Sequence, residues 1–216
     1  MNIILFGPPG AGKGTQSDNV ANKFNFYKIS TGDLLRTEIN NNTVLGNKIK
    51  SRIDKGLFVS DEIITNLIIN VLSNKKYYNR LVFDGYPRNI NQAKSLDILL
   101  RKYKQKISCV LNLNVDKELL IKRILGRIIC SKCGLTFNKY FNPPQNDMHK
   151  CEASFLMTRT DDNEKTIKNR YDTYSSQTLP VLAYYKDQKI LHEIDGTCEI
   201  NAIYDQICSI ITSLEA

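Results

Sequence analysis

Tryptophan is absent from this 216-residue sequence, histidine occurs only twice, and the apolar runs are short. A membrane-spanning helix needs about 20 consecutive apolar residues, whereas runs such as Ile63–Ile64 and Leu67–Ile69 are interrupted within a few positions. Six prolines and eleven glycines are too few for a collagen-like or low-complexity chain. The first residues include neither a basic leader nor a small-residue cleavage site, so we expect a cytoplasmic protein without membrane contact.

The charge is unbalanced, with 30 Lys+Arg against 22 Asp+Glu and a formal net charge of +8. This excess favours anionic partners, which include nucleic acids, phospholipid surfaces and phosphorylated small molecules. Scattered surface lysines that serve solubility are the alternative explanation. A strand-binding groove would combine its cations with aromatic side chains. Because the basic residues show no such clustering, we expect small-molecule anions and no nucleic acid.

Short apolar segments alternate with segments of helical periodicity along most of the chain. We predict strands at residues 2–6, 27–30, 81–84, 107–113 and 190–194, and helices at residues 13–24, 31–40, 43–55, 61–72, 89–102, 116–127, 164–185 and 200–214. Buried strands separated by helices are typical of a parallel sheet covered on both faces. The length indicates one α/β domain spanning residues 1–216, with ligands bound at the carboxyl ends of the strands.

Residues 128–160 break this alternation, since CSKCG, NPP and HKC punctuate the segment and little helical periodicity remains. We predict an inserted subdomain with a small core of its own, built from Phe137, Tyr140, Phe141 and Phe155. The chain has six cysteines, which we expect to be reduced, and the C-x-x-C spacing within this segment indicates metal binding rather than a disulfide.

A glycine-rich segment, GPPGAGKGT at residues 7–15, directly follows the first predicted strand and opens the first predicted helix. In that context, glycines let backbone N–H groups converge on an anion, the helix N-terminus adds positive potential, and a lysine reaches the β- and γ-phosphates. The predicted ATP-binding residues of this loop are Gly10, Ala11, Gly12, Lys13, Gly14 and Thr15. Gly14 stands where such loops usually carry Ser or Thr, which weakens the case for direct Mg²⁺ ligation by a loop hydroxyl.

Further motifs follow the phosphate loop: STGDLLR at residues 30–36, FDGYPR at 83–88, GR at 126–127 and RTDD at 159–162, continuing to Arg170. Together they resemble the adenylate kinase family over nearly the whole chain, and the middle segment resembles the long bacterial form whose lid can carry zinc. The resemblance implies a P-loop NTPase-type parallel sheet with a helical AMP-binding subdomain at residues 30–59 and a lid subdomain at 126–162. It also implies a monomer that reversibly transfers the terminal phosphoryl group of ATP to AMP, with Mg²⁺.

Guanidinium groups fork onto phosphate oxygens and keep their charge, which suits a reaction between two anionic nucleotides. For any single arginine, an ordinary surface salt bridge is the alternative. The catalytic cations implied by the resemblance are Lys13, Arg36, Arg88, Arg127, Arg159 and Arg170. Arg36 and Arg88 would hold the AMP phosphate, whereas the last three would surround the transferred phosphoryl group.

The resemblance assigns base and metal contacts as well. On the ATP side it implies Arg123, Arg127, Thr136, Phe137 and the backbone of Cys198. On the AMP side it implies Thr31, Arg36, Leu57, Phe58, Val59, Gly85, Tyr86, Arg88, Gln92, Arg159 and Arg170. Asp33 and Asp84 would organise the water shell of Mg²⁺, which dehydrates reluctantly. Residues 57–62 read LFVSDE where the family usually reads LVPDE, a departure that would loosen the AMP contact.

The metal ligands are only partly defined by the sequence. Cys130 and Cys133 form the first half of a zinc knuckle, and thiolates at this spacing suit tetrahedral Zn²⁺. For the second half we favour His149 and Cys151, because side chains two apart on an extended segment point the same way. The competing set replaces Cys151 by Glu152, and a lid without metal is a third alternative. With four protein ligands, the zinc would be structural.

Other functions compatible with the sequence are a kinase that prefers UMP, CMP or GMP, a P-loop ATPase that binds nucleic acid through a zinc module, and a redox switch at the C-x-x-C pair. The amide of Gln92 can both donate to and accept from an adenine edge, which does not exclude other bases. The FDGYPRN segment has no role in a nucleic-acid-binding ATPase, and nothing in the sequence indicates the exposed, acidic thiol that a redox switch needs.

Overall fold

The computed structural model describes residues 1–55, 57, 59–145 and 149–215. At its centre is a five-stranded parallel sheet in the order β2-β3-β1-β4-β8. The strands are β1 (Asn2–Phe6), β2 (Tyr27–Ser30), β3 (Leu81–Asp84), β4 (Cys109–Asn114) and β8 (Leu191–Asp195). Every residue of β1 is buried, as expected for the middle strand of a sheet covered on both faces. The predicted α/β class is confirmed.

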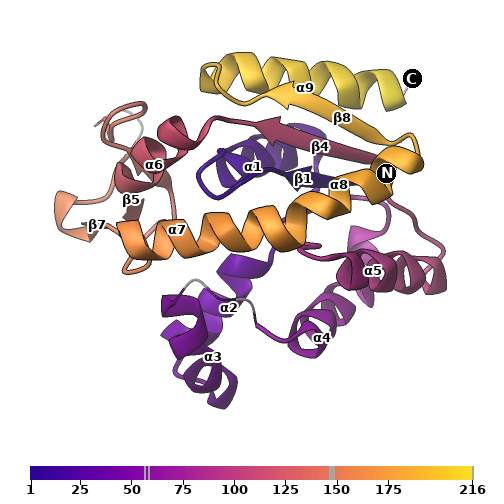
Figure 1. The fold of residues 1–216 in the computed structure, drawn as a ribbon, viewed down its shortest axis with the longest axis horizontal. Coiled ribbons are helices and arrows are strands. Elements are labelled where there is room, and N and C mark those ends of the chain that lie inside the picture. The colour runs from indigo at the N-terminus through magenta and orange to yellow at the C-terminus, as the bar shows by residue number, and fades with distance from the viewer. Residues whose placement is uncertain (56, 58, 146–148, 216) are drawn as a thin grey trace.

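Helices cover both faces of this sheet (Figure 1). They are α1 (Lys13–Phe24), α2 (Thr31–Asn40), α3 (Val44–Asp54), α4 (Asp61–Leu72), α5 (Ile90–Lys102), α6 (Lys117–Leu125), α7 (Glu164–Thr173), α8 (Leu179–Asp187) and α9 (Ile200–Glu215). On one face, Val20 of α1 and Ile207 of α9 pack against the sheet. On the other face, Ile68, Leu96 and Tyr185 contribute α4, α5 and α8 to a second core cluster. No helix in the described part of the chain combines the length and apolarity that a membrane crossing requires.

The helix predicted at residues 164–185 is interrupted. Between α7 and α8 lies a π-helical turn at Tyr174–Thr178, and α8 begins with Pro180 in its first turn. Proline has no backbone N–H to donate, and its ring clashes with the carbonyl of the preceding turn, so regular α-helical hydrogen bonding cannot pass through this point. The long helix predicted at residues 164–185 is therefore divided by the π-helical turn at Tyr174–Thr178.

Residues 126–162, here called the insert, contain a separate antiparallel sheet in the order β6-β5-β7. Its strands are β5 (Arg127–Cys130), β6 (Thr136–Asn138) and β7 (Leu156–Met157), with a short 3₁₀ turn at Ala153–Phe155. In Figure 1 the insert lies at the left, between α6 and α7 in chain order, while α2 and α3 lie below. The insert and the pair α2 and α3 lie near the edge of the main sheet formed by the carboxyl ends of its strands.

The core of the insert is smaller than expected. Phe137 is buried, but Tyr140 and Phe141 are 52% and 45% exposed, so the predicted cluster of four aromatic residues was wrong for these two. Lysine ammonium groups lie over the Tyr140 ring, with Lys139 Nζ 4.6 Å and Lys122 Nζ 5.6 Å from its centroid. Such cation–π contacts favour a ring at the surface, where the ammonium stays hydrated.

Candidate active site

The glycine-rich loop joins β1 to α1 and leaves the N-terminus of α1 open. Gly10 and Gly12 have φ values of +86° and +93°, a region that side chains rarely adopt. A Cβ atom on Gly10 would lie 2.8 Å from Ile124 on α6, so only a glycine at this position lets the loop pack against that helix. Gly12 is the N-cap of α1 with no capping side chain, and a Cβ there would meet nothing within 4 Å. Unpaired N–H groups facing open space at a helix start suit a phosphate group.

Lys13 occupies a half-buried, electropositive position beside this opening. Its Nζ donates to the carbonyls of Gly7 (2.7 Å) and Pro8 (2.9 Å). Burial lowers the pKa of Lys13 to about 8, and repulsion from the arginines around it acts in the same direction, while Asp84 opposes the shift. A lysine in such surroundings gains from a nearby anion.

Asp84 reaches the loop because neighbouring strands end together. In the sheet register, Asp84 pairs with Leu5 of β1 and Ser30 of β2. Its Oδ2 lies 3.7 Å from where a Cβ would stand on Gly14. Asp33 lies in the first turn of α2, where burial raises its pKa, but the Arg36 charge and hydrogen bonds from Arg36 and Ser30 outweigh this and lower it to about 2. Both sequence-predicted carboxylates therefore lie at the carboxyl edge of the sheet, and Asp33 is ionised at neutral pH.

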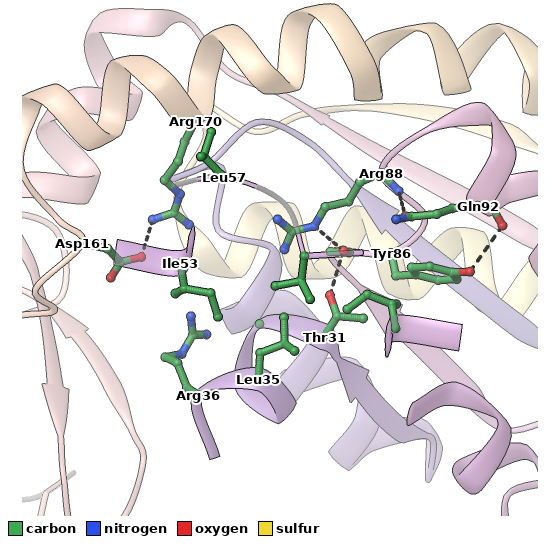
Figure 2. A pocket seen from close by; sticks show the side chains of 14 residues that line it. Thr31, Leu35, Arg36, Ile53, Leu57, Tyr86, Arg88, Gln92, Asp161 and Arg170 are labelled. Atoms are coloured by element: carbon green, nitrogen blue, oxygen red, sulfur yellow. Dashed lines mark hydrogen bonds and ion pairs between the residues drawn. The ribbon is translucent and has the colours of Figure 1, made fainter. Parts of the chain in front are cut away.

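A pocket opens beside this edge, between α2, the segment leading to α4, and α5 (Figure 2). It is lined by Thr31, Gly32, Leu35, Arg36, Ile53, Leu57, Val59, Ile64, Gly85, Tyr86, Arg88, Gln92, Asp161 and Arg170. Nearly every residue predicted to bind AMP is among them; Arg159 is not, and Phe58 lies outside the described residues. The segment between β3 and α5 is held in place at Gly85, whose carbonyl accepts hydrogen bonds from Thr31 Oγ1 (2.9 Å) and Arg88 Nε (2.6 Å).

Sequence reasoning missed the apolar wall of this pocket, formed by Leu35, Ile53 and Ile64 from three different helices. Helical spacing marks such residues as buried, but does not say whether they pack in the core or face a ligand. It also missed Asp161 as a lining residue, although the RTDD motif contains it.

The guanidinium groups converge on this region from separate elements. Figure 2 shows those of Arg36, Arg88 and Arg170 pointing into the same space. Mutual repulsion contributes to pKa values below the ordinary arginine value, to about 10 for Arg88, where burial is the main cause. Arg170 is shifted downward by burial in the same way, and its Nη1 donates to Asp161 at 2.9 Å.

Arg127, at the start of β5, is held by a forked hydrogen bond to Asp162. Its Nε donates to Oδ2 at 2.7 Å, and its Nη2 donates to Oδ1. Burial disfavours the charged guanidinium, but the hydrogen bonds and charge of Asp162 outweigh burial and raise the pKa of Arg127. Bidentate pairs of this kind fix orientation as well as charge.

Arg159 differs from Arg36, Arg127 and Arg170 because no carboxylate among the described residues forms an ion pair with it, although Asp33 and Asp161 favour its charged form from a distance. None of the ion pairs among the described residues includes Arg159, and its buried Nε has no hydrogen-bond partner there. Burial, followed by repulsion from Arg127 and Arg36, lowers the pKa of Arg159 to about 9. A buried donor without a partner is costly. The arrangement is one that an anionic ligand would stabilise.

Arg123, near the end of α6, lies beside the loop after β8 that contains Cys198. Arg123 Nη1 donates to the Gly196 carbonyl at 2.7 Å, two residues before Cys198 in the loop after β8. Thr136 is exposed on β6, whereas the Phe137 ring packs edge-on against His149, with 5.2 Å between centroids. Asn138 joins β6 to the end of α6, because its Nδ2 donates to the Arg123 carbonyl at 2.7 Å.

The sequence profile of the adenylate kinase family matches residues 5–190. The chain belongs to the adenylate kinase family. It is 48% identical to the adenylate kinase of Pelagibacter ubique, over 98% of this chain and 99% of the relative. It is 41% identical to that of Clostridium perfringens strain SM101, over 99% of both chains, and 43% identical to that of Methanothrix thermoacetophila, over the full length of both. The family resemblance inferred from the motifs is confirmed, and the parallel sheet agrees with the family's fold.

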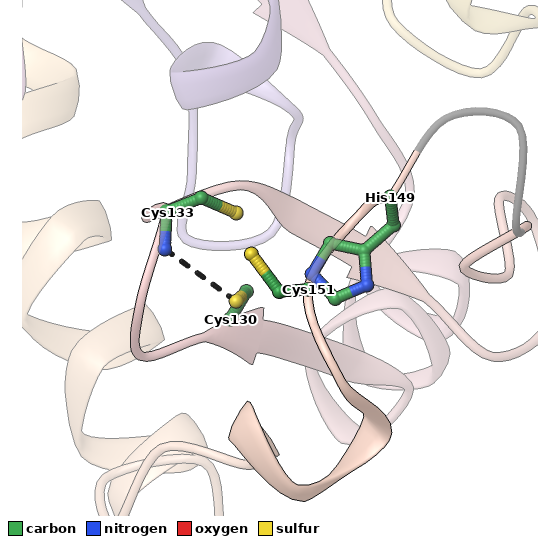
Figure 3. A group of neighbouring side chains, drawn as sticks. All are labelled: Cys130, Cys133, His149 and Cys151. Atoms are coloured by element: carbon green, nitrogen blue, oxygen red, sulfur yellow. Dashed lines mark hydrogen bonds between the residues drawn. The ribbon is translucent and has the colours of Figure 1, made fainter.

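The insert of this chain brings together a group of potential metal ligands (Figure 3). One ligand atom each from Cys130, Cys133, His149 and Cys151 lies within 4.8 Å of the others. Tetrahedral zinc with Zn–S bonds of about 2.3 Å places neighbouring sulfurs about 3.8 Å apart. These are the four residues favoured by the sequence. Glu152 is not part of the group, and its carboxylate lies 3.4 Å from Ser154 Oγ.

The chemistry of these donors fits zinc. His149 is buried, and its Nε2 has no hydrogen-bond partner among the described residues. Burial opposes ionisation of Cys130, but hydrogen bonds from the Cys133 backbone and from His149 outweigh it and lower the pKa of this thiol to about 6. A thiolate beside an unpartnered imidazole nitrogen is what a structural zinc ion requires.

Proposed function

We propose that this chain catalyses the reaction of its family, the reversible transfer of the terminal phosphoryl group of ATP to AMP, through the cations that surround the glycine-rich loop. The observation that carries the proposal is the convergence of these cations, with the Arg159 guanidinium left without an anionic partner among the described residues. Donor and acceptor phosphates repel each other, and charge spreads over the transferring group in the transition state. Fixed cations in a water-poor site lower that barrier.

ATP would place its phosphates at the open N-terminus of α1. There the Lys13 ammonium, which donates to loop carbonyls in the free protein, would move to phosphate oxygens. Mg²⁺ accompanies ATP in kinases and neutralises charge on its β- and γ-phosphates. Asp84 and Asp33 would hold water molecules of that ion, and Arg123 and the backbone of Cys198 would contact the ATP base.

AMP would occupy the pocket beside α2. Arg36 and Arg88 would bind its phosphate, and Gln92 would face its base together with the backbone of Leu57 and Val59. An acceptor phosphate is mostly deprotonated near neutral pH, so the reaction needs no general base. Arg127, Arg159 and Arg170 would then stabilise the transferring group; by resemblance Phe58, Thr136 and Phe137 complete the base contacts.

We further propose that the insert acts as a lid and that residues 30–59 form an AMP-binding subdomain. Arg127 and Arg159 belong to the insert, so its closure would bring cations to the phosphates and exclude water, which otherwise competes as acceptor. Zinc bound by the Cys₃His group would stabilise the insert without entering the chemical step, since protein ligands fill all four positions. Free cysteines throughout the described chain suit a reducing, cytoplasmic compartment. We expect a monomer.

The direct test is formation of ADP from ATP and AMP by the purified protein with Mg²⁺, with UMP, CMP and GMP substituted for AMP in turn. We expect rapid ADP formation with AMP, and none after Mg²⁺ is chelated. Faster turnover with another acceptor would assign a different nucleoside monophosphate kinase activity. Failure to form ADP with any acceptor would overturn the proposal.

A further inference from the structure

We propose that Asp61, the first residue of α4, is a positioning residue that fixes the direction of the Gln92 side-chain amide and thereby makes the acceptor site select adenine over guanine. This inference rests on the proposed function, because it takes the pocket to hold the acceptor base. It assigns selectivity to a residue that does not line the pocket itself.

Gln92 is held from several directions in the first turn of α5. The residue is only 3% exposed, although it lines the pocket. Its Nε2 donates to Asp61 Oδ1 at 2.6 Å, and its Oε1 accepts from the Arg88 backbone N–H at 2.7 Å. The main chain is fixed too, because the Gln92 carbonyl accepts from Tyr86 Oη at 3.4 Å (Figure 2). In addition, Asn89 Oδ1 accepts from the Gln92 N–H at 2.8 Å.

The two hydrogen-bond partners of the Gln92 side chain allow its amide only one orientation. An ionised carboxylate such as Asp61 can only accept hydrogen bonds, and a backbone N–H such as that of Arg88 can only donate. A reversed amide would place Oε1 against the carboxylate and Nε2 against the N–H, so both hydrogen bonds would be lost at once. Asn89 Nδ2, at 3.4 and 3.5 Å from the two carboxylate oxygens, helps to hold Asp61 in place.

An amide fixed in this way offers a defined pattern to a base. One Nε2 hydrogen and one Oε1 lone pair remain after the contacts with Asp61 and Arg88. Adenine matches them, because its exocyclic N6 amine donates and the adjacent ring nitrogens accept. On its Watson–Crick edge, guanine carries the acceptor O6 in place of that amine and the donor N1–H in place of the ring acceptor, and would require the reversed amide; on its other edge O6 and N7 both accept, which the Gln92 amide matches in neither orientation. A free Gln side chain reads either base, whereas one anchored by Asp61 favours adenine.

The test is Asp61→Asn, which preserves side-chain volume and removes the restriction, since an Asn amide can accept from or donate to Gln92. The matched control is Glu62→Gln, which removes the same charge from the next, exposed residue of α4. We measure kcat/KM for AMP and for GMP with saturating ATP, and the inhibition constant of GMP against AMP. We expect Asp61→Asn to lower the AMP-over-GMP ratio about tenfold, with the KM for ATP unchanged and with Glu62→Gln resembling the wild type.

An unchanged AMP-over-GMP ratio in Asp61→Asn would overturn the inference, whether both activities are retained or both fall by the same factor, as a purely structural role would give. Thermal denaturation confirms that the variants fold, and GMP inhibition reports selectivity even where turnover is slow. Failure of the proposed function is seen separately, because the wild type itself would then form no ADP from ATP and AMP.

Discussion

Replacing Arg159 by methionine should make the free protein more stable and the enzyme much slower. Arg159 has a buried Nε without a hydrogen-bond partner among the described residues, and repulsion from Arg127 and Arg36 adds to the cost of burying its charge. Methionine has a similar length and no charge to desolvate, so it removes this penalty while filling the space.

The magnitude follows from the lowered pKa of Arg159, about 9. Each pKa unit corresponds to about 1.4 kcal/mol, so the charged form is disfavoured by several kcal/mol in the folded protein. Because the side chain is partly exposed, solvent screening reduces this to about 1–3 kcal/mol. The folded-state pKa lies below that of the unfolded chain, and for a base the penalty is then fully present below pH 9 and disappears as both states lose the proton.

The assay compares urea denaturation at pH 7.5 with the rate of ADP formation. We expect Arg159→Met to unfold at a higher urea concentration and to lose about 10³–10⁵ in turnover, the scale of a transition-state arginine. Added ADP should stabilise the wild type more than the variant. Arg101→Met, at the exposed end of α5, serves as the control. A variant that is less stable than the wild type and keeps most of its activity would refute the reasoning.

The remaining predictions concern other parts of the same machinery. Arg88→Ala and Arg127→Ala should each lower turnover by about 10³–10⁵ with circular dichroism unchanged; purified variants that retain most of the activity would contradict their roles. With the pKa of Lys13 at about 8 in the free protein, kcat/KM for ATP should fall as pH rises above 8, because the neutral amine no longer attracts phosphate; a profile that stays flat to pH 10 would argue against this. Protein purified without chelators should contain one zinc per chain, whereas Cys130→Ala should contain none, and Cys198→Ala, outside the ligand group, should match the wild type; equal metal content in both variants would exclude the site. Zinc removal should lower the thermal midpoint but leave the chemical step unchanged, which single-turnover kinetics would check.

The sequence predicted those parts of the fold that local patterns determine. The strand at residues 2–6 and the helix at 13–24 agree with the structure to the residue. The apolar run forms the strand, and the Gly- and Pro-rich loop that follows marks where the strand ends and the helix begins. The strand predicted at 107–113 begins two residues later, since the buried Ile107 precedes the hydrogen-bonded ladder. The π turn before Pro180 depends on how one helix accommodates proline, which periodicity does not reveal.

The candidate site was predicted less evenly. Motif positions named the arginines, but not that Asp161 and Asp162 compensate two of them and leave Arg159 without an ion pair among the described residues. The metal group was predicted, because the spacing of His149 and Cys151 favoured the set that the structure brings together, but the sequence alone left Glu152 as an alternative to Cys151. Tertiary pairing decides both questions, and it is not local information.

The Arg127–Asp162 pair joins the first strand of the insert to the residue at which the insert ends. This ion pair thus holds together the two ends of a stretch of more than thirty residues, next to the ion pair between Asp161 and Arg170 of α7. In the proposed reaction, phosphate oxygens would compete with Asp162 for the Arg127 guanidinium. If the insert closes over bound nucleotides as proposed, their binding would weaken this ion pair as the insert moves inward, so that substrate, and not backbone flexibility alone, would control the movement.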